Sequence, residues 1–123
     1  MVRSPSQPSD NLNRALILEQ LDGNSELMIE LVQLFSEEAP QLIEAMRNSF
    51  QHGDMQGLAR SAHSLKGAAS NFLAHGTVGA ALQVEDDAKR GDTESARTAL
   101  AALEVIVERL LTELANLCQG SPE

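Results

Sequence analysis

The sequence predicts an all-α protein, built as an antiparallel up-and-down four-helix bundle with an additional short N-terminal helix. Leu and Ala are the commonest residues and there is no Trp or Tyr, so helix formers are abundant and strand formers scarce. Glycines divide the chain into segments whose apolar residues recur with helical spacing. The connections between these segments are short, which favours antiparallel neighbours. A length of 123 residues is sufficient for one domain with one core.

Proline, serine and polar side chains dominate both ends of the chain. The first ten residues, MVRSPSQPSD, have the composition of a flexible linker, and the last residues, QGSPE, are similar. We therefore expect a leader over residues 1–10, a helical domain over residues 11–119 and a disordered tail over residues 120–123.

Five glycines are predicted to end helices, because glycine is the usual residue after a helix C-terminus. They are Gly23, Gly53, Gly76, Gly91 and Gly120. The helices that they delimit are expected over residues 12–22, 25–51, 55–74, 77–89 and 93–118.

The segment over residues 25–51 is predicted to begin with Asn24 or Ser25 as its N-cap. Pro40 lies inside it, and proline removes one backbone hydrogen bond, so we expect a kink or two abutting helices near Ala39. The residues expected to share its buried face are Leu27, Leu31, Leu34, Leu42, Met46 and Phe50.

The two segments nearest the C-terminus are also amphipathic. Residues 77–89 carry a short stripe of Val78, Ala81, Leu82, Glu85 and Ala88. The acidic run Glu85, Asp86 and Asp87 is expected to form a solvated face. Residues 93–118, with Asp92 as N-cap, carry a longer stripe of Ala96, Leu100, Leu103, Val107, Leu110, Leu114 and Leu117.

The segment over residues 55–74 differs from the others in what it presents to solvent. Its core stripe is Leu58, Ala62, Leu65, Ala69 and Phe72. His63 lies about 140° from the centre of that stripe, so its imidazole is predicted to be exposed. The residues that share its side of the helix are Gln56, Ala59, Arg60, Lys66, Gly67 and Ser70, which make a locally basic surface.

Gly67 lies in the helix interior, one turn after His63, where glycine costs about 1 kcal/mol relative to alanine. One physical use for it is clearance, because without a Cβ another molecule can approach the imidazole closely. The alternative is a close contact between helices, although Gly67 points away from the core stripe. Lys66 can place an ammonium beside a group held by His63. An exposed neutral imidazole is a competent nucleophile, so these three residues together suggest reversible phosphorylation of His63.

The simpler interpretation is that His63 is an ordinary surface histidine and Lys66 a solvated surface lysine. His52 and His75 each precede a glycine predicted to end a helix, where an imidazole has a structural role beside the helix C-terminus. We assign them no function. Cys118 is expected to be a small apolar residue in the last helical turn.

The net charge of −9 disfavours nucleic acid and anionic membrane surfaces as partners. No apolar run in the sequence is long enough to span a membrane, and no signal peptide is expected at its start. A lone cysteine fits a reducing compartment, so a cytoplasmic location is expected. A monomer is favoured because a complete bundle satisfies its own core. No metal site is predicted.

The stretch AHSLKGAASNFLA, residues 62–74, resembles the active helix of histidine-containing phosphotransfer (HPt) domains. The matching residues are His63, Leu65, Lys66 and Gly67, followed by small residues. The preceding LDGNSELMIELVQLFSEEAPQLIEAM and the following LQVEDDAKRGD also resemble the family. The chain departs from it at Leu73, where HPt domains usually have a second glycine.

This resemblance implies that His63 accepts a phosphoryl group from the phospho-aspartate of one receiver domain and returns it to an aspartate of another. Lys66 would stabilise the phosphoryl oxygens and Gly67 would let the receiver approach, with Arg60, Gln56, Ala59 and Ser70 in the docking surface. No cofactor is expected on this domain, and Mg²⁺ is expected on the partner receiver. The chain has no nucleotide-binding loop, so it would be a relay without kinase activity of its own.

Two other interpretations stay open at this point. The phosphoacceptor domain of a chemotaxis-type histidine kinase has a similar helix but receives its phosphoryl group from an ATP-binding domain. A helical scaffold would perform no chemistry at His63. Because the start of the chain resembles an interdomain linker, one origin for it is the C-terminal domain of a membrane-anchored hybrid sensor kinase, whose receiver and response regulator would then be partners.

Overall fold

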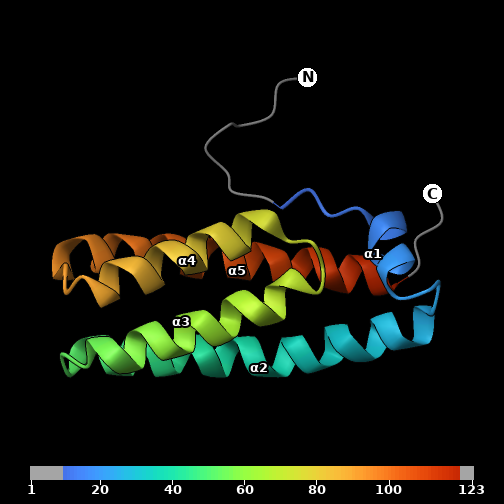
Figure 1. The fold of residues 1–123 in the computed structure, drawn as a ribbon. Coiled ribbons are helices and arrows are strands. Elements are labelled where there is room, and N and C mark those ends of the chain that lie inside the picture. Colours follow the sequence, from blue (N-terminus) through green and yellow to red (C-terminus); the bar gives the residue numbers. More distant parts are fainter. Residues whose placement is uncertain (1–9, 120–123) are drawn as a thin grey trace, which may run out of the picture.

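The computed structural model describes residues 10–119, and within them every regular element is a helix. These are α1 (Arg14–Gln20), α2 (Ser25–Gln51), α3 (Met55–Ser70), α4 (His75–Lys89) and α5 (Thr93–Cys118). The predicted all-α fold is confirmed (Figure 1). The expected leader, except for Asp10, and the expected tail with Gly120 lie outside the described residues.

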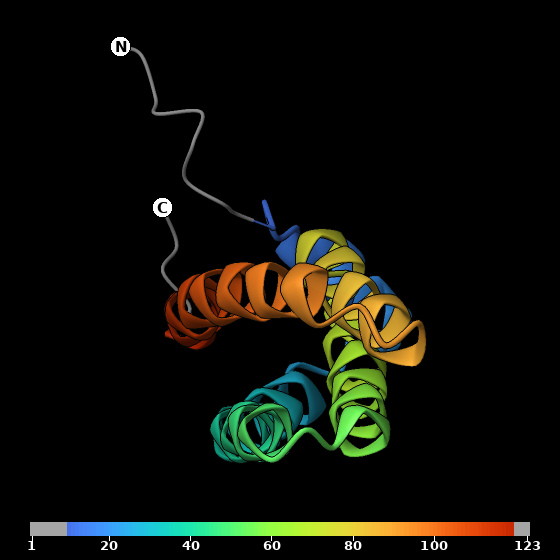
Figure 2. The ribbon, with the colours of Figure 1, turned by 90° about the vertical axis from the view of Figure 1, so that its left-hand side faces the viewer.

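The four long helices form the bundle in chain order, each packed against the next, and α5 returns to contact α2. Seen from one end, they surround a common core (Figure 2). The short α1 lies at the end of the bundle where α2 begins and α5 ends (Figure 1). This places α3 and α4 side by side along their length, which matters for the site described below.

The predicted core stripe of α3 is confirmed, since all five of its residues are buried. The stripe of α5 is also confirmed, although Leu117 at its end is only partly buried. The stripe predicted for α2 is only partly right: Met46 is buried, Leu27, Leu31, Leu42 and Phe50 are partly buried, and Leu34 is 50% exposed, because the buried face is turned by one position. The buried residues of α2 are Met28, Val32, Phe35, Ala39, Ile43 and Met46. Two apolar stripes one residue apart run along this helix, and only packing against α3 and α5 selects between them.

α2 is one helix through Pro40, so the alternative of two abutting helices is wrong. Pro40 and Ser36 both lie on the exposed side of α2. The hydrogen bond that proline removes, from residue 40 to the Ser36 carbonyl, is therefore lost on the exposed side of the helix. The N-cap of α2 is Asn24, whose side chain accepts a hydrogen bond from Leu27 N at 3.0 Å.

The connection between α3 and α4 differs from the prediction. α3 ends at Ser70 instead of residue 74, and Leu73 has a left-handed backbone with φ 54°. Gly76 does not end a helix but lies in the first turn of α4, which begins at His75. The turn glycines Gly23, Gly53 and Gly91 do adopt the positive φ predicted for residues after a helix. Leu73 takes that role at the third connection.

The stripe predicted for α4 is only partly right, since Leu82 is exposed while Thr77, Val84 and Asp87 are buried. The N-cap of α4 is Ala74, which offers no capping side chain. Asp10 supplies the missing acceptor from 67 residues away in sequence, through bonds from Thr77 N at 2.8 Å and Thr77 Oγ1 at 2.7 Å. The last residue of the expected leader is thus attached to the bundle.

Among residues 10–119, no helix is both long and apolar enough to cross a membrane.

Candidate functional site

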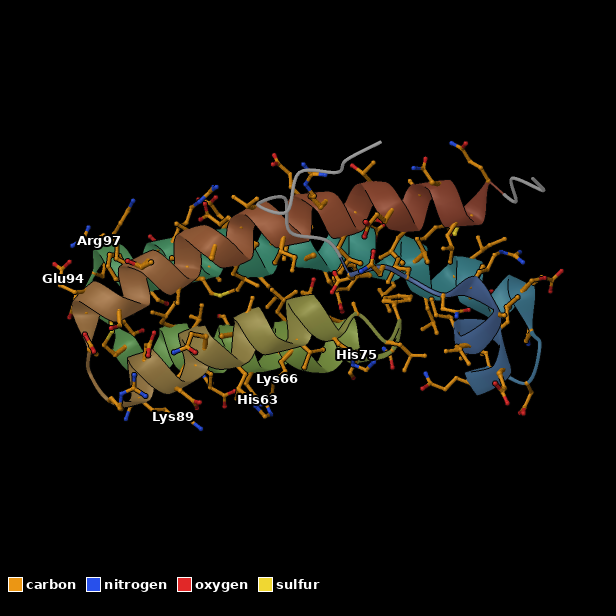
Figure 3. The ribbon with its side chains drawn as sticks, turned by 90° about the horizontal axis from the view of Figure 1, so that it is seen from above. His63, Lys66, His75, Lys89, Glu94 and Arg97 are labelled. Atoms are coloured by element: carbon orange, nitrogen blue, oxygen red, sulfur yellow. The ribbon has the colours of Figure 1, made fainter. Side chains whose placement is uncertain are left out.

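His63 projects from the outer side of α3, and its side chain is 66% exposed. The helix positions it there because Ala62 and Leu65 on either side are fully buried in the core. Figure 3 shows His63, Lys66 and Lys89 along the same long edge of the bundle. The prediction of an exposed imidazole is confirmed.

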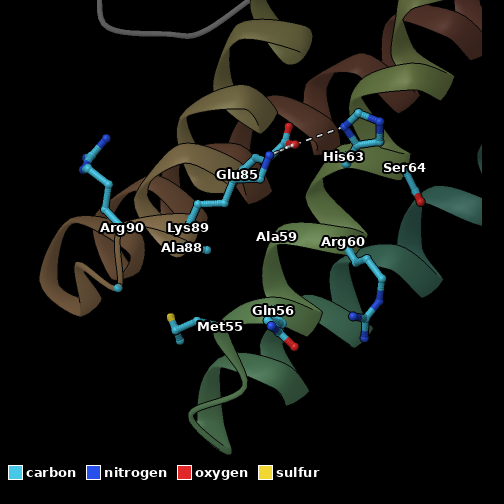
Figure 4. Close-up of a pocket in the computed structure, with 11 residues that line it drawn as sticks. Met55, Gln56, Ala59, Arg60, His63, Ser64, Glu85, Ala88, Lys89 and Arg90 are labelled. Atoms are coloured by element: carbon cyan, nitrogen blue, oxygen red, sulfur yellow. Dashed lines mark hydrogen bonds and ion pairs between the residues drawn. The ribbon is translucent and has the colours of Figure 1, made fainter.

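A buried carboxylate on α4 holds this exposed imidazole. The side chain of Glu85 is 6% exposed, and its Oε2 lies 3.1 Å from His63 Nδ1 (Figure 4). An ionised carboxylate can only accept hydrogen bonds, so Nδ1 is the ring nitrogen that carries the proton. The lone pair of the neutral ring is then on Nε2.

Two lysines share the same carboxylate. Lys66 Nζ donates to Glu85 Oε1 at 2.9 Å, and Lys89 Nζ lies 3.0 Å from Glu85 Oε2. The hydrogen bond from Lys66 is the largest cause that lowers the pKa of Glu85 to about 2, and it outweighs the opposing effect of burial. Bonds from Lys89 and His63 act in the same direction. Glu85 is therefore ionised at neutral pH and keeps three nitrogen groups together.

The expectation that Glu85, Asp86 and Asp87 form a solvated face is wrong for two of the three. Glu85 is buried at the site, and Asp87 is 2% exposed, accepting hydrogen bonds from Gln83 Nε2 at 3.0 Å and from Arg90 Nη2. Only Asp86 is exposed. A run of acidic residues in a sequence does not show which of them meets cations from a neighbouring helix, and Lys66 comes from α3.

Sequence reasoning also missed Lys89 as a site residue. Its position four residues after Glu85 is a spacing that pairs charges on one helix face, so a signal was present. That signal gains meaning only because α3 brings Lys66 and His63 to the same carboxylate.

Gly67 is exposed, and a Cβ added to it would meet nothing within 4 Å. The glycine is therefore not required by packing inside the bundle. Space lies open on the side of α3 that carries His63, as expected if the glycine lets another molecule approach the imidazole. Ser70, also exposed, donates from Oγ to the Gly67 carbonyl at 2.6 Å, so its hydroxyl is held against the helix.

An open groove of about 1010 Å³ runs between α3 and α4 beside His63. Gln56 and Arg60, both exposed, line it as expected for a docking surface. Ala59 was predicted on the same outward face, but it is only 7% exposed because α4 packs over that side of α3, and it lies at the bottom of the groove.

The two other histidines lie apart from this site. His52 is the C-cap of α2, and its Nδ1 lies 2.8 Å from the Asn48 carbonyl, which confirms a structural role at a helix end. His75 is the first residue of α4 and not the end of a helix, because the preceding turn is closed at Leu73 instead of at Gly76. Its predicted place at a helix C-terminus is wrong.

No group of three or more His, Cys, Asp or Glu side chains in the described part of the chain has the arrangement of a metal site. The chemistry that these residues offer is that of a nucleophilic imidazole beside two ammonium groups. Such a group can hold and release an anion, and a phosphoryl group is the anion that a histidine can carry covalently.

Comparison with known proteins agrees with this chemistry. The family model of the Hpt domain matches residues 30–120, so the chain belongs to the Hpt family. It is a histidine phosphotransfer module of phosphorelays. Among solved structures it is similar to histidine-containing phosphotransfer protein B (HptB) from Pseudomonas aeruginosa PAO1. The two share 22% sequence identity over 94% of this chain and 97% of that chain, with a TM-score of 0.81, a likeness of fold. The search of curated proteins gave no match.

Proposed function

We propose that His63 is the phosphoacceptor, taking a phosphoryl group from a receiver phospho-aspartate and passing it to the aspartate of a second receiver. The observation that carries this proposal is the hydrogen bond between exposed His63 Nδ1 and buried Glu85. It fixes the ring and leaves the lone pair on Nε2, the nitrogen turned away from Glu85. Receivers of a hybrid sensor kinase and of a response regulator are the partners, and the domain acts as a monomer.

The transfer step is a displacement at phosphorus. The Nε2 lone pair forms the N–P bond while the acyl phosphate P–O bond breaks, and the electrons of that bond leave on the partner's aspartate carboxylate. The proton stays on Nδ1, so the phosphorylated ring gains positive charge, which the Glu85 carboxylate 3.1 Å away neutralises. Transfer to a second receiver runs the same step in reverse and restores the neutral ring.

Lys66 and Lys89 supply positive charge on the same edge as His63. Because both ammonium groups are held by Glu85, they stay near the imidazole without occupying its Nε2. We assign them the neutralisation of the phosphoryl oxygens, since phosphoryl transfer depends on positioning and charge compensation. This domain needs no cofactor of its own for that step, and Mg²⁺ would come with the partner receiver. Gly67 leaves the approach open.

The direct test incubates the protein with a panel of phosphorylated receivers and follows acid-labile label on the protein. The His63→Gln variant should lose labelling completely, because glutamine cannot form the N–P bond, while its unfolding free energy should change by less than about 0.5 kcal/mol. His75→Gln is the matched control and should be labelled at the parent rate.

Labelling of His63→Gln at the parent rate would refute the assignment of His63. Absence of label on the parent protein with every receiver would refute the relay. If label then appeared with an ATP-binding kinase domain and ATP, the protein would be a chemotaxis-type phosphoacceptor. If it appeared with neither, the protein would be a helical scaffold.

A further inference from the structure

A second groove lies between α2 and α5. Its α2 wall runs from Pro40 to Arg47 and its α5 wall from Glu104 to Leu111, and it holds about 390 Å³. These stretches of helix, at about 1.5 Å per residue, make it roughly 12 Å long. Figure 2 shows α2 and α5 on one side of the bundle and α3 and α4 on the other. The groove therefore lies apart from the edge that carries His63, and the proposed transfer makes no use of it.

The inner surface of this groove is apolar. Ile43 and Val107 in its lining are buried, while Val105 beside them is 48% exposed. An apolar side chain left in water gains free energy when a partner covers it. A furrow between two packed helices has the shape that accepts the side-chain ridge of a third helix. At this length, the fitting occupant is a helix of about two turns with an apolar stripe.

Carboxylates form the rim of the groove. The side chain of Glu44 is 75% exposed and that of Glu104 is 29% exposed, and exposed Glu108 follows Glu104 by one turn of α5. Arg47 also lines the groove, with Nε 2.8 Å from Glu104 Oε2 and Nη1 3.4 Å from Glu44 Oε1. These three carboxylates share one guanidinium, which leaves the rim acidic. Lysine or arginine is therefore favoured on the flanks of the occupant.

The charges of whole helices favour the same kind of partner. α2 carries five glutamates and one arginine, whereas the charged side chains of α3 are Arg60 and Lys66. A basic partner is attracted to the α2 side of the molecule and repelled from the α3 side, so it reaches this groove in preference to the histidine edge. A second copy of the chain joined through the same groove would set carboxylates against carboxylates, so it does not fit.

We propose that the groove between α2 and α5 binds a basic amphipathic helix of a second partner protein, which stays bound while a receiver occupies the His63 edge. This inference goes beyond the relay, because it needs no phosphoryl group and no contact with His63. The apolar stripe of the helix covers Val105, and its lysines or arginines lie beside Glu44 and Glu108. Such a partner would anchor the domain without interrupting phosphoryl transfer.

The probe is a synthetic peptide of about 14 residues, with leucine and alanine along one helical face and lysine on both flanks. The parent protein should bind it at least about tenfold more tightly than a peptide of the same composition in scrambled order, because only the first has an apolar stripe. Amide chemical-shift changes should gather in residues 40–47 and 104–111. Absence of binding, or shifts centred on α3 and α4, would overturn the proposal.

Two matched charge reversals on α2 test the rim. Glu44→Lys should weaken the Kd of the peptide about tenfold, with a smaller effect at high salt. Glu38→Lys makes the same change on the same helix, but exposed residue 38 lies about 160° around α2 from Pro40, so Kd should stay within about twofold. Equal loss in the two variants would reduce the effect to net charge and overturn the site.

A third variant, Val105→Asn, tests the apolar contact without changing the charge. It should weaken binding of the peptide about fivefold, because the half-exposed valine no longer offers apolar surface to the stripe. Unchanged affinity in Val105→Asn would overturn the apolar contact and with it the proposed kind of partner.

Receiver phosphotransfer separates this proposal from the relay. Parent protein saturated with the peptide should take label within about twofold of its rate without the peptide, since the two sites are distant and independent. Glu44→Lys under the same conditions controls for any effect of the peptide on the receiver. Greater slowing in the parent than in this control would overturn simultaneous binding. A protein that binds the peptide but takes label from no receiver would refute the relay and leave the groove standing.

Discussion

At the scale of single residues, Glu85 organises the site more than any other side chain. Its two carboxylate oxygens hold His63, Lys66 and Lys89, which come from two helices. A buried charge is costly unless it is paired and hydrogen-bonded, and here three nitrogen groups provide the pairing. The same contacts that keep Glu85 ionised also choose the proton position on the histidine ring. We infer that Glu85 is a positioning residue for His63.

The pairing of Glu85 predicts that part of the free energy of unfolding depends on pH. The folded-state pKa of Glu85 is about 2, against 4.5 for the ordinary side chain. Because the pKa is lower in the folded state, ionised Glu85 contributes to the free energy of unfolding. This contribution is complete above about pH 4.5 and is lost as the pH falls toward 2. Its size is at most about 3 kcal/mol. The parent should exceed Glu85→Gln in unfolding free energy at pH 7, and the difference should shrink across that window, as measured by urea unfolding.

Asp86→Asn is the control, because Asp86 is the exposed neighbour of Glu85. Its difference from the parent should stay small and constant with pH. A Glu85→Gln difference that does not change between pH 7 and pH 3 would contradict the pairing. The same variant tests positioning through the ¹⁵N chemical shifts of His63, since glutamine can donate as well as accept and should allow both ring tautomers.

At the scale of elements, the connection between α3 and α4 explains how the chain departs from its family at Leu73. Leucine rarely adopts a positive φ, yet Leu73 has φ 54° and closes the end of α3 where HPt domains usually have glycine. Its side chain packs against the core, beside the buried Phe72 and Ala74. Partial burial of the leucine side chain thus offsets the strained backbone.

Two substitutions at Leu73 separate the effect of backbone strain on stability from the effect of losing the side chain. Leu73→Ala and Leu73→Gly both remove the partly buried side chain, but only alanine retains the left-handed strain. Leu73→Gly should therefore be more stable than Leu73→Ala by about 1 kcal/mol in chemical unfolding. Equal stability of the two variants would show that the turn relaxes and that Leu73 is not strained. Ala80, in the middle of α4, provides the reference change Ala80→Gly, which should be destabilising by about 1 kcal/mol.

At the scale of the whole molecule, the N-terminal segment is attached to the end of the bundle at two places. Asp10 accepts two hydrogen bonds from Thr77 at the start of α4, and Gln20 Nε2 donates to the Asn71 carbonyl at 3.3 Å. These contacts connect the beginning of the described chain with the α3–α4 connection. The helix that Asp10 caps is the one that carries Glu85 and Lys89.

Asp10→Ala should therefore lower the unfolding free energy by about 1 to 2 kcal/mol, because it removes a cap and leaves the buried Thr77 hydroxyl without its acceptor. Hydrogen exchange should rise at the Thr77 amide and little in α5. Glu19→Ala, on exposed α1, is the control and should cost less than about 0.5 kcal/mol. Unchanged exchange at Thr77 in Asp10→Ala would contradict the capping.

Most of the fold follows from patterns within single helices. The caps at Asn24 and Asp92, the turn glycines and the stripes of α3 and α5 depend on residues a few positions apart, so the sequence predicts them correctly. The buried face of α2 could not be predicted in the same way, since two stripes compete there and the neighbouring helices decide.

In the site too, features that depend on one helix were predictable and features that depend on contacts between helices were not. Sequence alone determined the helical bundle, the outward direction of His63 and the open side at Gly67, because the direction of a side chain follows from its place in one helix. Only the tertiary structure decided that Glu85 is buried beside His63, that Lys89 joins Lys66, and that Ala59 and Ala88 form one groove. Those contacts join residues on different helices, and the periodicity within one segment does not show which residues of the neighbouring helix its side chains meet.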